Sequence, residues 1–274
     1  MIKPILKYPG AKWRLAPWIA SYLPEHETYI EPYCGSAAVF FAKEPAGSEI
    51  LNDRFGCIVN LFRVLREHGQ ELAHLIDFTA WSRDEYELCE RQFTDTGSDI
   101  EDARRFLVRC WQAHGTRFNR PSGWRNTGKL ANAGTTTVWR QLPDRLLAAI
   151  DRLKMAEIES RPAIEVIRRY NAPDCLIYAD PPYVLDTRNG AYYEYEMSDQ
   201  EHLELLQALG EHRGPVALSG YAHPLYDSRL SHWHRITLPV IAEHGRQRTE
   251  VLWLNPRAAQ SRQLRLFDGS EVAG

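Results

Sequence analysis

Short apolar runs bounded by turn-forming residues predict the strands of a sheet. The clearest is the run 175–179, which is apolar throughout and is followed by an aspartate and two prolines. Runs at 28–33, 48–52 and 215–219 have the same character, as do 234–240 and 249–254, which the polar segment 242–247 separates as in a hairpin. Short continuous apolar runs are typical of strands buried on both faces.

Helical patterns alternate with these strands. Segments 36–43 and 56–68 follow the first two strands, and a further helix begins at Ser198, where Ser198 and Glu201 form a capping box ahead of leucines at helical spacing. Strands alternating with helices predict an α/β fold around a mostly parallel sheet.

The middle of the chain breaks this alternation. Residues 66–155 are polar, with helical patches and a stretch rich in Gly, Asn and Thr. We therefore expect two halves of one domain, 1–65 and 156–256, a mainly helical insert at 66–155 and a flexible tail at 257–274.

Charge is distributed unevenly along the chain. The whole chain carries −3, from 33 basic and 36 acidic residues, whereas the window Arg104–Arg145 holds nine basic residues and only Asp144 as an acid. That window is therefore +8 and the remainder −11. Aromatic residues, among them Trp111, Phe118, Trp124 and Trp139, lie between the basic ones. The mixture suits contact with phosphates and base edges, and it equally suits a solvated basic face over packed aromatics.

Cysteine usage and hydropathy indicate the compartment. The five cysteines are odd in number and none is at C-x-x-C spacing. This predicts free thiols in a reducing, cytoplasmic environment and no metal site. The first residues contain no apolar run of signal-peptide length, and no segment approaches a membrane span, so we expect no membrane partner.

The tetrapeptide Asp180-Pro181-Pro182-Tyr183 is the sharpest chemical signal. It follows the apolar run 175–179, and ligands bind at the carboxyl ends of strands in open parallel sheets. A carboxylate and a free backbone carbonyl can each accept one hydrogen of an exocyclic base amine, and a tyrosine can stack on the base. The alternative is a turn with a capping aspartate.

Two further turns indicate a ligand site. The segment 31–37, Glu-Pro-Tyr-Cys-Gly-Ser-Ala, is a turn of small residues between a predicted strand and helix, where a ligand can approach the backbone. Asp53 ends the next strand, and an acid there commonly accepts hydrogen bonds from ribose hydroxyls. A tight turn and a helix N-cap are the alternatives for these two features.

Together these motifs resemble the Dam-like (D12 class, alpha-group) DNA adenine-N6 methyltransferases. Residues 7–12 resemble the family's K-W-x-G-G-K segment, 29–40 its E-P-F-x-G-x-G cofactor loop, 51–53 its acidic strand end and 177–183 its catalytic D-P-P-Y. Segments 216–221 and 250–255 resemble its later strands. The order also agrees, with a large insert between the cofactor half and D-P-P-Y. The chain departs from the pattern at Tyr8 (Trp in the family), at Pro9 and at Ala37 (both Gly).

The resemblance implies a class I, Rossmann-like methyltransferase sheet that binds S-adenosyl-L-methionine (AdoMet) and methylates the N6 amine of a flipped-out adenine. The insert would be the target-recognition subdomain on double-stranded DNA. The catalytic residues implied are Asp180, Pro181, Pro182 and Tyr183. The cofactor residues implied are Tyr8, Gly10, Lys12, Glu31, Pro32, Tyr33, Gly35, Ser36, Asp53 and Asp180. Partial resemblance and the basic, aromatic composition of the insert give the DNA-contact residues Arg117, Asn119, Arg120, Trp124, Arg125, Lys129 and Arg140. Lys7, ahead of the cofactor loop, joins this set through the resemblance, which places it against either a base edge or the cofactor.

Other functions stay open at this point. The pocket chemistry also suits the N4 amine of cytosine, an RNA or protein-amide methyltransferase is a more distant alternative, and a DNA-binding module without activity is a third. In the tail, Gln263, Leu264, Leu266 and Phe267 resemble the peptide by which bacterial proteins dock on the sliding clamp. The alternative is that this tail packs on its own domain.

Overall fold

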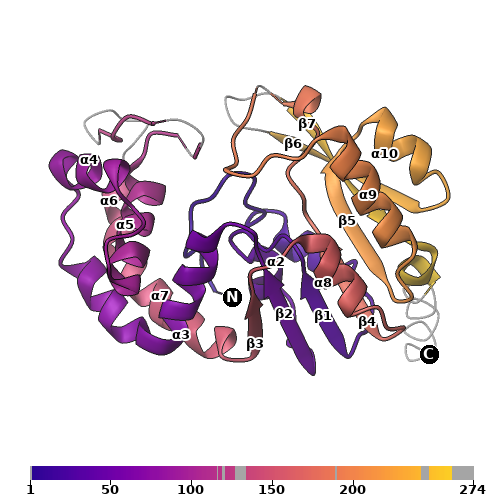
Figure 1. Ribbon diagram of the computed structural model, residues 1–274, viewed down its shortest axis with the longest axis horizontal. Helices are drawn as coiled ribbons and strands as arrows, with labels where there is room; N and C mark the ends of the chain where they lie inside the picture. Colours follow the sequence, from indigo (N-terminus) through magenta and orange to yellow (C-terminus); the bar gives the residue numbers. More distant parts are fainter. Residues whose placement is uncertain are drawn as a thin grey trace, which may run out of the picture.

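The computed structural model describes residues 2–115, 117–118, 121–126, 134–188, 190–241 and 247–260. Within them lies a seven-stranded sheet of order β3-β2-β1-β4-β5-β7-β6 (Figure 1). The strands are β1 Thr28–Glu31, β2 Ser48–Asn52, β3 Ala156–Glu159, β4 Cys175–Ala179, β5 Val216–Tyr221, β6 His234–Ile241 and β7 Gln247–Leu254. The structure thus confirms the α/β fold, and β2 and β4 have the predicted bounds.

The order of the strands places the ends of β1 and β4 side by side. Strands β3, β2, β1, β4 and β5 are parallel, and β7 is antiparallel to both β5 and β6, which confirms the predicted hairpin. From β1 the chain moves outward through β2 to β3 and then returns to β4 on the other side. The crevice outside the carboxyl ends of such a pair is where open α/β sheets bind ligands.

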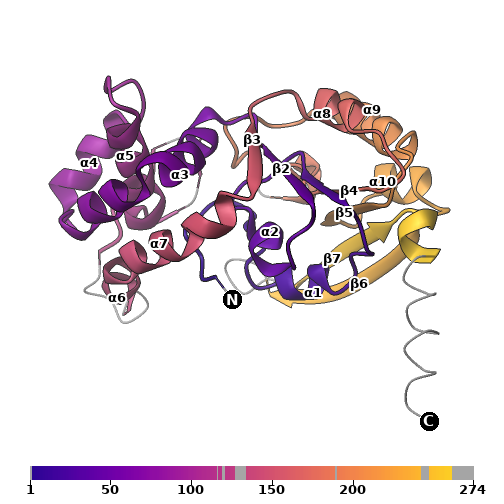
Figure 2. The same ribbon diagram turned by 90° about the horizontal axis from the view of Figure 1, so that it is seen from below.

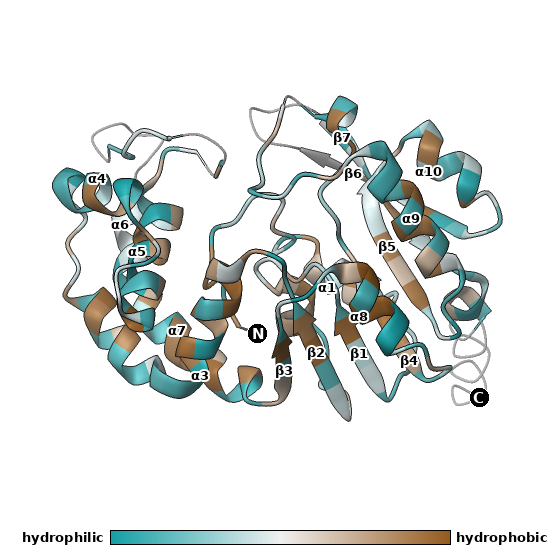
Figure 3. Cartoon of the chain, in the orientation of Figure 1, coloured by the Kyte–Doolittle hydropathy of each residue, from teal (hydrophilic) through white to brown (hydrophobic). Residues whose placement is uncertain are grey.

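Helices cover both faces of the sheet, α8, α9 and α10 on one and α1 and α2 on the other (Figure 2). Neighbouring strand residues alternate between these layers: Ile30 and Ile177 pack with α8 and α9, whereas Tyr29 and Tyr178 face the opposite core. Apolar residues line the strands and the helices against them (Figure 3). The helices are α1 Ala16–Ala20, α2 Ala38–Ala42, α3 Gly56–Asp77, α4 Arg83–Arg91, α5 Asp99–Gln112, α6 Thr135–Arg140, α7 Leu142–Leu153, α8 Ala163–Arg169, α9 Asp199–Gly210 and α10 Pro224–Arg229.

Helices α3 to α7 form a lobe at one end of the sheet (Figure 1). Helix α3 crosses the expected boundary at 65/66 without ending, and it kinks at His68, where the backbone is not helical. At the kink Gly69 lets α7 approach, because a Cβ there would lie 2.5 Å from Ile150. The lobe and sheet share one apolar core, and Arg152 of α7 forms an ion pair with Glu49, buried on β2. The insert is therefore packed on the sheet rather than tethered to it.

The structure corrects the charge argument for the insert. Arg104 and Arg105 both pair with Glu101, and Arg104 also pairs with Glu85, while Arg109 is buried against Glu90. All three glutamates lie just outside the window that counts as +8. Three of its nine basic residues are therefore neutralised inside the lobe, and the surface available to a phosphate backbone is less basic than the sequence window indicates.

Residues near the carboxyl end follow a different course from the one expected. Residues 256–260 are helical, so the tail expected at 257–274 begins inside a helix. The clamp-docking segment Gln263–Phe267 lies outside the described residues, and its role stays a prediction.

All five cysteines are buried thiols without disulfide bonds. Among the described residues, no helix is both long and apolar enough to cross a membrane.

Candidate active site

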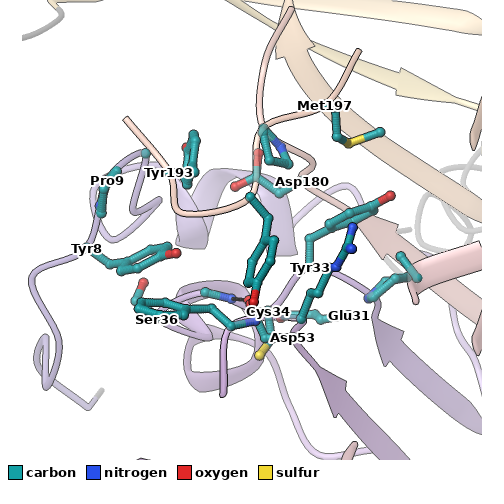
Figure 4. A pocket seen from close by; sticks show the side chains of 18 of the residues that line it. Tyr8, Pro9, Glu31, Tyr33, Cys34, Ser36, Asp53, Asp180, Tyr193 and Met197 are labelled. Atoms are coloured by element: carbon teal, nitrogen blue, oxygen red, sulfur yellow. Dashed lines mark hydrogen bonds between the residues drawn. The ribbon is translucent and has the colours of Figure 1, made fainter. Parts of the chain in front are cut away.

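A pocket lies at the carboxyl ends of β1, β2 and β4, where the strand order places the crevice. All ten residues expected to bind the cofactor line it, namely Tyr8, Gly10, Lys12, Glu31, Pro32, Tyr33, Gly35, Ser36, Asp53 and Asp180. Asp180 lies in the upper part of the view in Figure 4 and Asp53 in the lower part. The two carboxyl groups mark the two ends of the pocket. We call them the target end, around Asp180, and the cofactor end, around Asp53.

Backbone hydrogen bonds fix the carboxylate of Asp53. Its Oδ2 accepts from the amide of Gly35 at 2.9 Å, and its Oδ1 accepts from the amide of Phe55 at 2.8 Å. Phe55 rather than Asp53 is the N-cap residue of α3, so the alternative of a helix cap does not hold. Burial raises the pKa of Asp53 to about 6, although both amide donors oppose the shift. A carboxylate so held keeps free lone pairs directed into the pocket.

Asn52, directly before Asp53, joins three loops of the cofactor end. This fully buried side chain donates to the carbonyls of Pro32 and Arg161 and accepts from the amide of Arg161 at 2.9 Å. It thereby places residues 161–164, which run from the loop after β3 into the first turn of α8, along the pocket wall. Sequence reasoning missed this wall, because it depends on a contact between residues 109 positions apart.

Glu31 supports the cofactor loop from beneath. Its Oε1 accepts from the Tyr29 hydroxyl and from the amide of Phe40 in α2, both at 2.7 Å. Burial raises the pKa of Glu31 to about 8, against the effect of these two donors, and the nearby Asp180 carboxylate adds to the rise. The side chain borders the pocket, but its hydrogen bonds hold the turn between β1 and α2.

The departure at Ala37 has a conformational consequence. Gly35 (φ +48°) and Ala37 (φ 52°) both adopt left-handed conformations in the turn that leads into α2. Glycine tolerates this region freely, whereas an L-residue with a Cβ is strained there. The resemblance predicts glycine at this position, and the chain keeps the backbone shape with alanine.

At the target end, Asp180 is held by two neighbours. The hydroxyl of Ser219 on β5 donates to its Oδ1 at 2.7 Å, and the ammonium of Lys12 lies 2.9 Å from its Oδ2. Lys12 is buried and also donates to the carbonyl of Gly10. Burial alone would lower the pKa of Lys12, but the carboxylates of Asp180 and Glu250 outweigh it and raise the pKa above its ordinary value. Lys12 is therefore an ammonium that occupies one acceptor atom of Asp180.

Glu250 on β7 is a second carboxyl group that sequence reasoning missed. It is buried, it accepts a short hydrogen bond from the Tyr183 hydroxyl, and its Oε1 lies 3.9 Å from the Lys12 ammonium. Burial raises the pKa of Glu250, a shift that Lys12 and Tyr183 oppose. The signal was available, because a glutamate directly before the apolar run 251–254 needs a partner when it is buried.

The structure places the four expected catalytic residues unequally. Asp180 and Pro182 line the pocket, whereas Pro181 and Tyr183 are not among its lining residues. The Tyr183 ring lies instead beneath the Lys12 ammonium, 4.7 Å from it, and edge-on to Tyr221. Tyr8 and Tyr193 form an aromatic side of the pocket, with ring centroids 6.0 Å apart (Figure 4).

Acidic groups outnumber basic ones along the lining. The acids are Glu31, Asp53, Asp180, Glu196, Glu201 and Glu204, and the bases are Lys12, Arg54 and Arg161. The aromatic residues Tyr8, Tyr33, Phe55, Tyr193 and Tyr195 accompany them. Such a lining suits a ligand that combines a flat ring, hydroxyl donors and a net positive charge.

The expected DNA-contact residues lie in several places. Arg117 stacks its guanidinium over Tyr192, Trp124 donates to Gln112, and Arg125 donates to the carbonyls of Ala113 and His114. Arg140 is exposed at the end of α6, and Lys7 is partly buried ahead of the pocket. Asn119, Arg120 and Lys129 lie outside the described residues.

Comparison with known proteins gives one informative match. The family described as D12 class N6 adenine-specific DNA methyltransferase matches residues 8–236. No curated protein matches the chain. A crystal structure of precorrin 8W decarboxylase from Methanobacterium thermoautotrophicum is 10% identical over 93% of this chain and 95% of that chain, with a TM-score of 0.31.

Proposed function

The chain belongs to the D12 class N6 adenine-specific DNA methyltransferase family, and from that premise we propose how its residues divide the reaction. As a member it is an enzyme that methylates the N6 amine of adenine in DNA, so methylation of the cytosine N4 amine is not favoured. In our proposal the cofactor end binds AdoMet and the target end binds the adenine.

The residues of the cofactor end fit AdoMet. The free lone pairs of Asp53 would accept from ribose hydroxyls, and the acidic, aromatic lining suits a cationic ligand with a flat ring. Residues 161–164 and Phe55 would border the ring. When bound, AdoMet supplies a methyl group that its sulfonium centre has already activated.

Lys12 carries the proposal for the target end. Its ammonium lies 2.9 Å from Asp180 Oδ2 and 4.7 Å above the Tyr183 ring. A base stacked on Tyr183 would place its exocyclic amine at the same position, so Lys12 marks the site of the target amine. The adenine displaces Lys12, and Asp180 and the Pro181 carbonyl then accept the two amine hydrogens.

The order of proton loss follows from the chemistry of the amine. The neutral amine has its lone pair delocalised into the ring, and hydrogen bonds to Asp180 and Pro181 direct that lone pair toward the methyl group. The amine becomes acidic only once the new N–C bond gives it a positive charge. Asp180 is in position to accept that proton, so it need not act as a strong base beforehand.

Two observations would test this assignment together. After reaction with unmethylated genomic DNA, mass analysis of nucleosides should find N6-methyladenine and no N4-methylcytosine. Replacement of Asp180 by alanine should abolish the product. If N4-methylcytosine forms, or if the Asp180→Ala protein still methylates at the wild-type rate, the assignment of the target end is wrong.

We assign the helical lobe, with Lys7, to contact with double-stranded DNA around an extruded adenine. Arg140 is the cleanest probe because it is exposed and has no role in the pocket. Arg140→Ala should weaken DNA binding and reduce the slope of log affinity against log salt by about one. Arg91→Ala, at an exposed arginine of α4 outside the expected set, serves as the matched control. Equal slopes for the two variants would argue against this surface.

A further inference from the structure

The segment after the Asp180–Tyr183 turn is closed on itself by one partly buried ion pair. Arg188 pairs with Glu196 through both guanidinium amino groups, and their side chains are only 7% and 19% exposed. Glu196 Oε1 also accepts from the amides of Tyr192 and Tyr193, at 2.6 and 3.0 Å. This pair organises residues 184–188 and 190–197, where η2, Leu185–Thr187, is the sole helical turn among those described.

One side of this pair reaches the catalytic turn. The remaining guanidinium donor, Arg188 Nε, donates to the carbonyl of Tyr183 at 2.7 Å. The position of that peptide sets the position of the Tyr183 ring and of the two prolines before it. Arg188 therefore holds the turn with one nitrogen and Glu196 with the others.

The other side reaches the pocket and the helical lobe. Tyr193 lines the pocket, and its hydroxyl lies close against Gly10. A Cβ on Gly10 would come within 2.3 Å of that hydroxyl oxygen. The carbonyl of Tyr192 accepts from the amide of Phe118, and the Tyr192 ring lies 4.4 Å from the Arg117 guanidinium. Phe118 in turn packs against Tyr8 and Phe55. The pair thus lies between a lobe residue expected to contact DNA and the peptide that carries the catalytic tyrosine.

We propose that Arg188 and Glu196 are positioning residues for methyl transfer, which couple the Arg117–Phe118 segment of the lobe to the Asp180–Tyr183 turn. The inference rests on the proposed function of that turn. Neither residue touches the reacting atoms. Their effect is geometric, and a displacement of about 1 Å at a reacting group is enough to cost orders of magnitude in rate.

The test is single-turnover methyl transfer with saturating AdoMet and unmethylated genomic DNA. Glu196→Gln removes the ion pair but keeps an acceptor for the two amides, and Arg188→Lys keeps the charge but cannot bridge Glu196 and Tyr183. Both should lower the rate about tenfold or more. Arg188 is not among the residues that line the pocket, so the AdoMet dissociation constant of Arg188→Lys should change less than about twofold. Glu101→Gln, at a glutamate that also pairs with two arginines, is the matched control and should keep the wild-type rate.

A double-mutant cycle separates coupling from simple loss of structure. If the lobe acts through this pair, Arg117→Ala should slow transfer by itself but add little in the Glu196→Gln background. Independent effects of the two substitutions, or an unchanged rate in Glu196→Gln, would overturn the proposal, as would a parallel loss of AdoMet binding and thermal stability in Arg188→Lys. An inactive wild-type protein would instead count against the proposed function.

Discussion

The two ends of the pocket are held by different kinds of interaction. At the cofactor end, Asp53, Asn52 and Glu31 bind backbone groups of neighbouring loops, so each carboxyl or amide fixes a piece of main chain. At the target end the contacts around the carboxyl groups join side chains: Lys12 with Asp180, and Tyr183 with Glu250. A contact to a backbone group ties a loop in place, whereas two side chains in contact can both rotate away without moving the main chain.

This difference suits the two ligands. In our proposal a cofactor end held by main-chain contacts is already shaped for AdoMet, whereas Lys12 occupies the target end. An extruded base would then have to compete with Lys12, so the target end would favour a ligand that offers Asp180 an amine together with a ring for Tyr183. The two ends should therefore fail in different ways when they are altered.

The largest expected effect is at Asp180. Asp180→Ala removes an acceptor of the target amine, and we expect the single-turnover rate to fall at least about a hundredfold. Because the cofactor end is held without Asp180, calorimetric AdoMet affinity should stay near the wild-type value. The Asp180→Asn protein keeps the size of the side chain and one acceptor oxygen. Its single-turnover rate should lie between those of the wild type and Asp180→Ala. Unfolding of both variants would show a structural aspartate instead.

A smaller effect is expected at Asp53, and there it should fall on AdoMet affinity rather than on the rate of transfer. Asp53→Ala removes a hydrogen bond from a ribose hydroxyl to a charged acceptor, worth about 1.5–3 kcal/mol, so AdoMet should bind roughly ten- to a hundredfold more weakly. With AdoMet raised to saturation, the rate of transfer should largely recover. A rate that stays low at saturation would place Asp53 in the chemistry of the target end.

Protonation of Asp53 should make cofactor binding depend on pH. The pKa of Asp53 is about 6, and its ionised form is the better acceptor for hydroxyl donors. AdoMet affinity should therefore be highest above pH 6 and should fall by up to about tenfold per pH unit below it. Calorimetry between pH 5 and 8 checks this, with Asp53→Asn as the control that does not titrate. An identical pH profile for both proteins would contradict the assignment.

At Glu250 we expect a several-fold effect. Glu250→Ala leaves the buried Tyr183 hydroxyl without its acceptor and should slow transfer by up to about tenfold, whereas Glu250→Gln should restore most of the rate. In a Tyr183→Phe background the alanine substitution should have little further effect. If the glutamine and alanine variants are equally slow, Glu250 acts through its negative charge beside Lys12 rather than through its hydrogen bond with Tyr183.

The last expected effect is on stability rather than on activity and comes from Glu31. Its folded-state pKa of about 8 lies above its ordinary value near 4.3, so the native state binds the proton more tightly than the unfolded state. The free energy of unfolding should therefore fall as pH rises between these values, by roughly 1 kcal/mol per pH unit at most. Glu31→Gln should remove this contribution. Denaturant unfolding at pH 5 and pH 8 measures the difference, and equal slopes in both proteins would refute it.

Most of the sheet could be predicted because its strands are locally distinct. Strands β2 and β4 are apolar runs between turn signals, and they appear at the expected residues. Strand β3, Ala156–Glu159, was missed because it is a polar edge strand that alternates Ala and Ile with glutamates. Its identity depends on pairing with β2, which no local pattern records.

The sequence predicted the motif residues that line the pocket but not the neighbouring side chains that hold them in place. Most motif residues gather in one pocket because they lie at the carboxyl ends of β1, β2 and β4, whereas Tyr8, Gly10 and Lys12 approach it from the segment ahead of β1. Glu196 also lines the pocket and Glu250 contacts Tyr183 and Lys12, and the partners of both glutamates are set by tertiary contacts. The charge of the lobe was overestimated for a related reason, since Glu101 precedes the basic window by only three positions and pairs with two of its arginines.

The division of the pocket into two ends is tested most directly by a crossed measurement. Asp180→Ala and Asp53→Ala are each assayed for AdoMet affinity by calorimetry and for single-turnover methyl transfer at saturating AdoMet. We predict that Asp180→Ala binds AdoMet normally and transfers almost nothing, while Asp53→Ala binds weakly and transfers at a rate near wild type. If both substitutions reduce affinity and rate together, the pocket acts as one unit and the division is wrong.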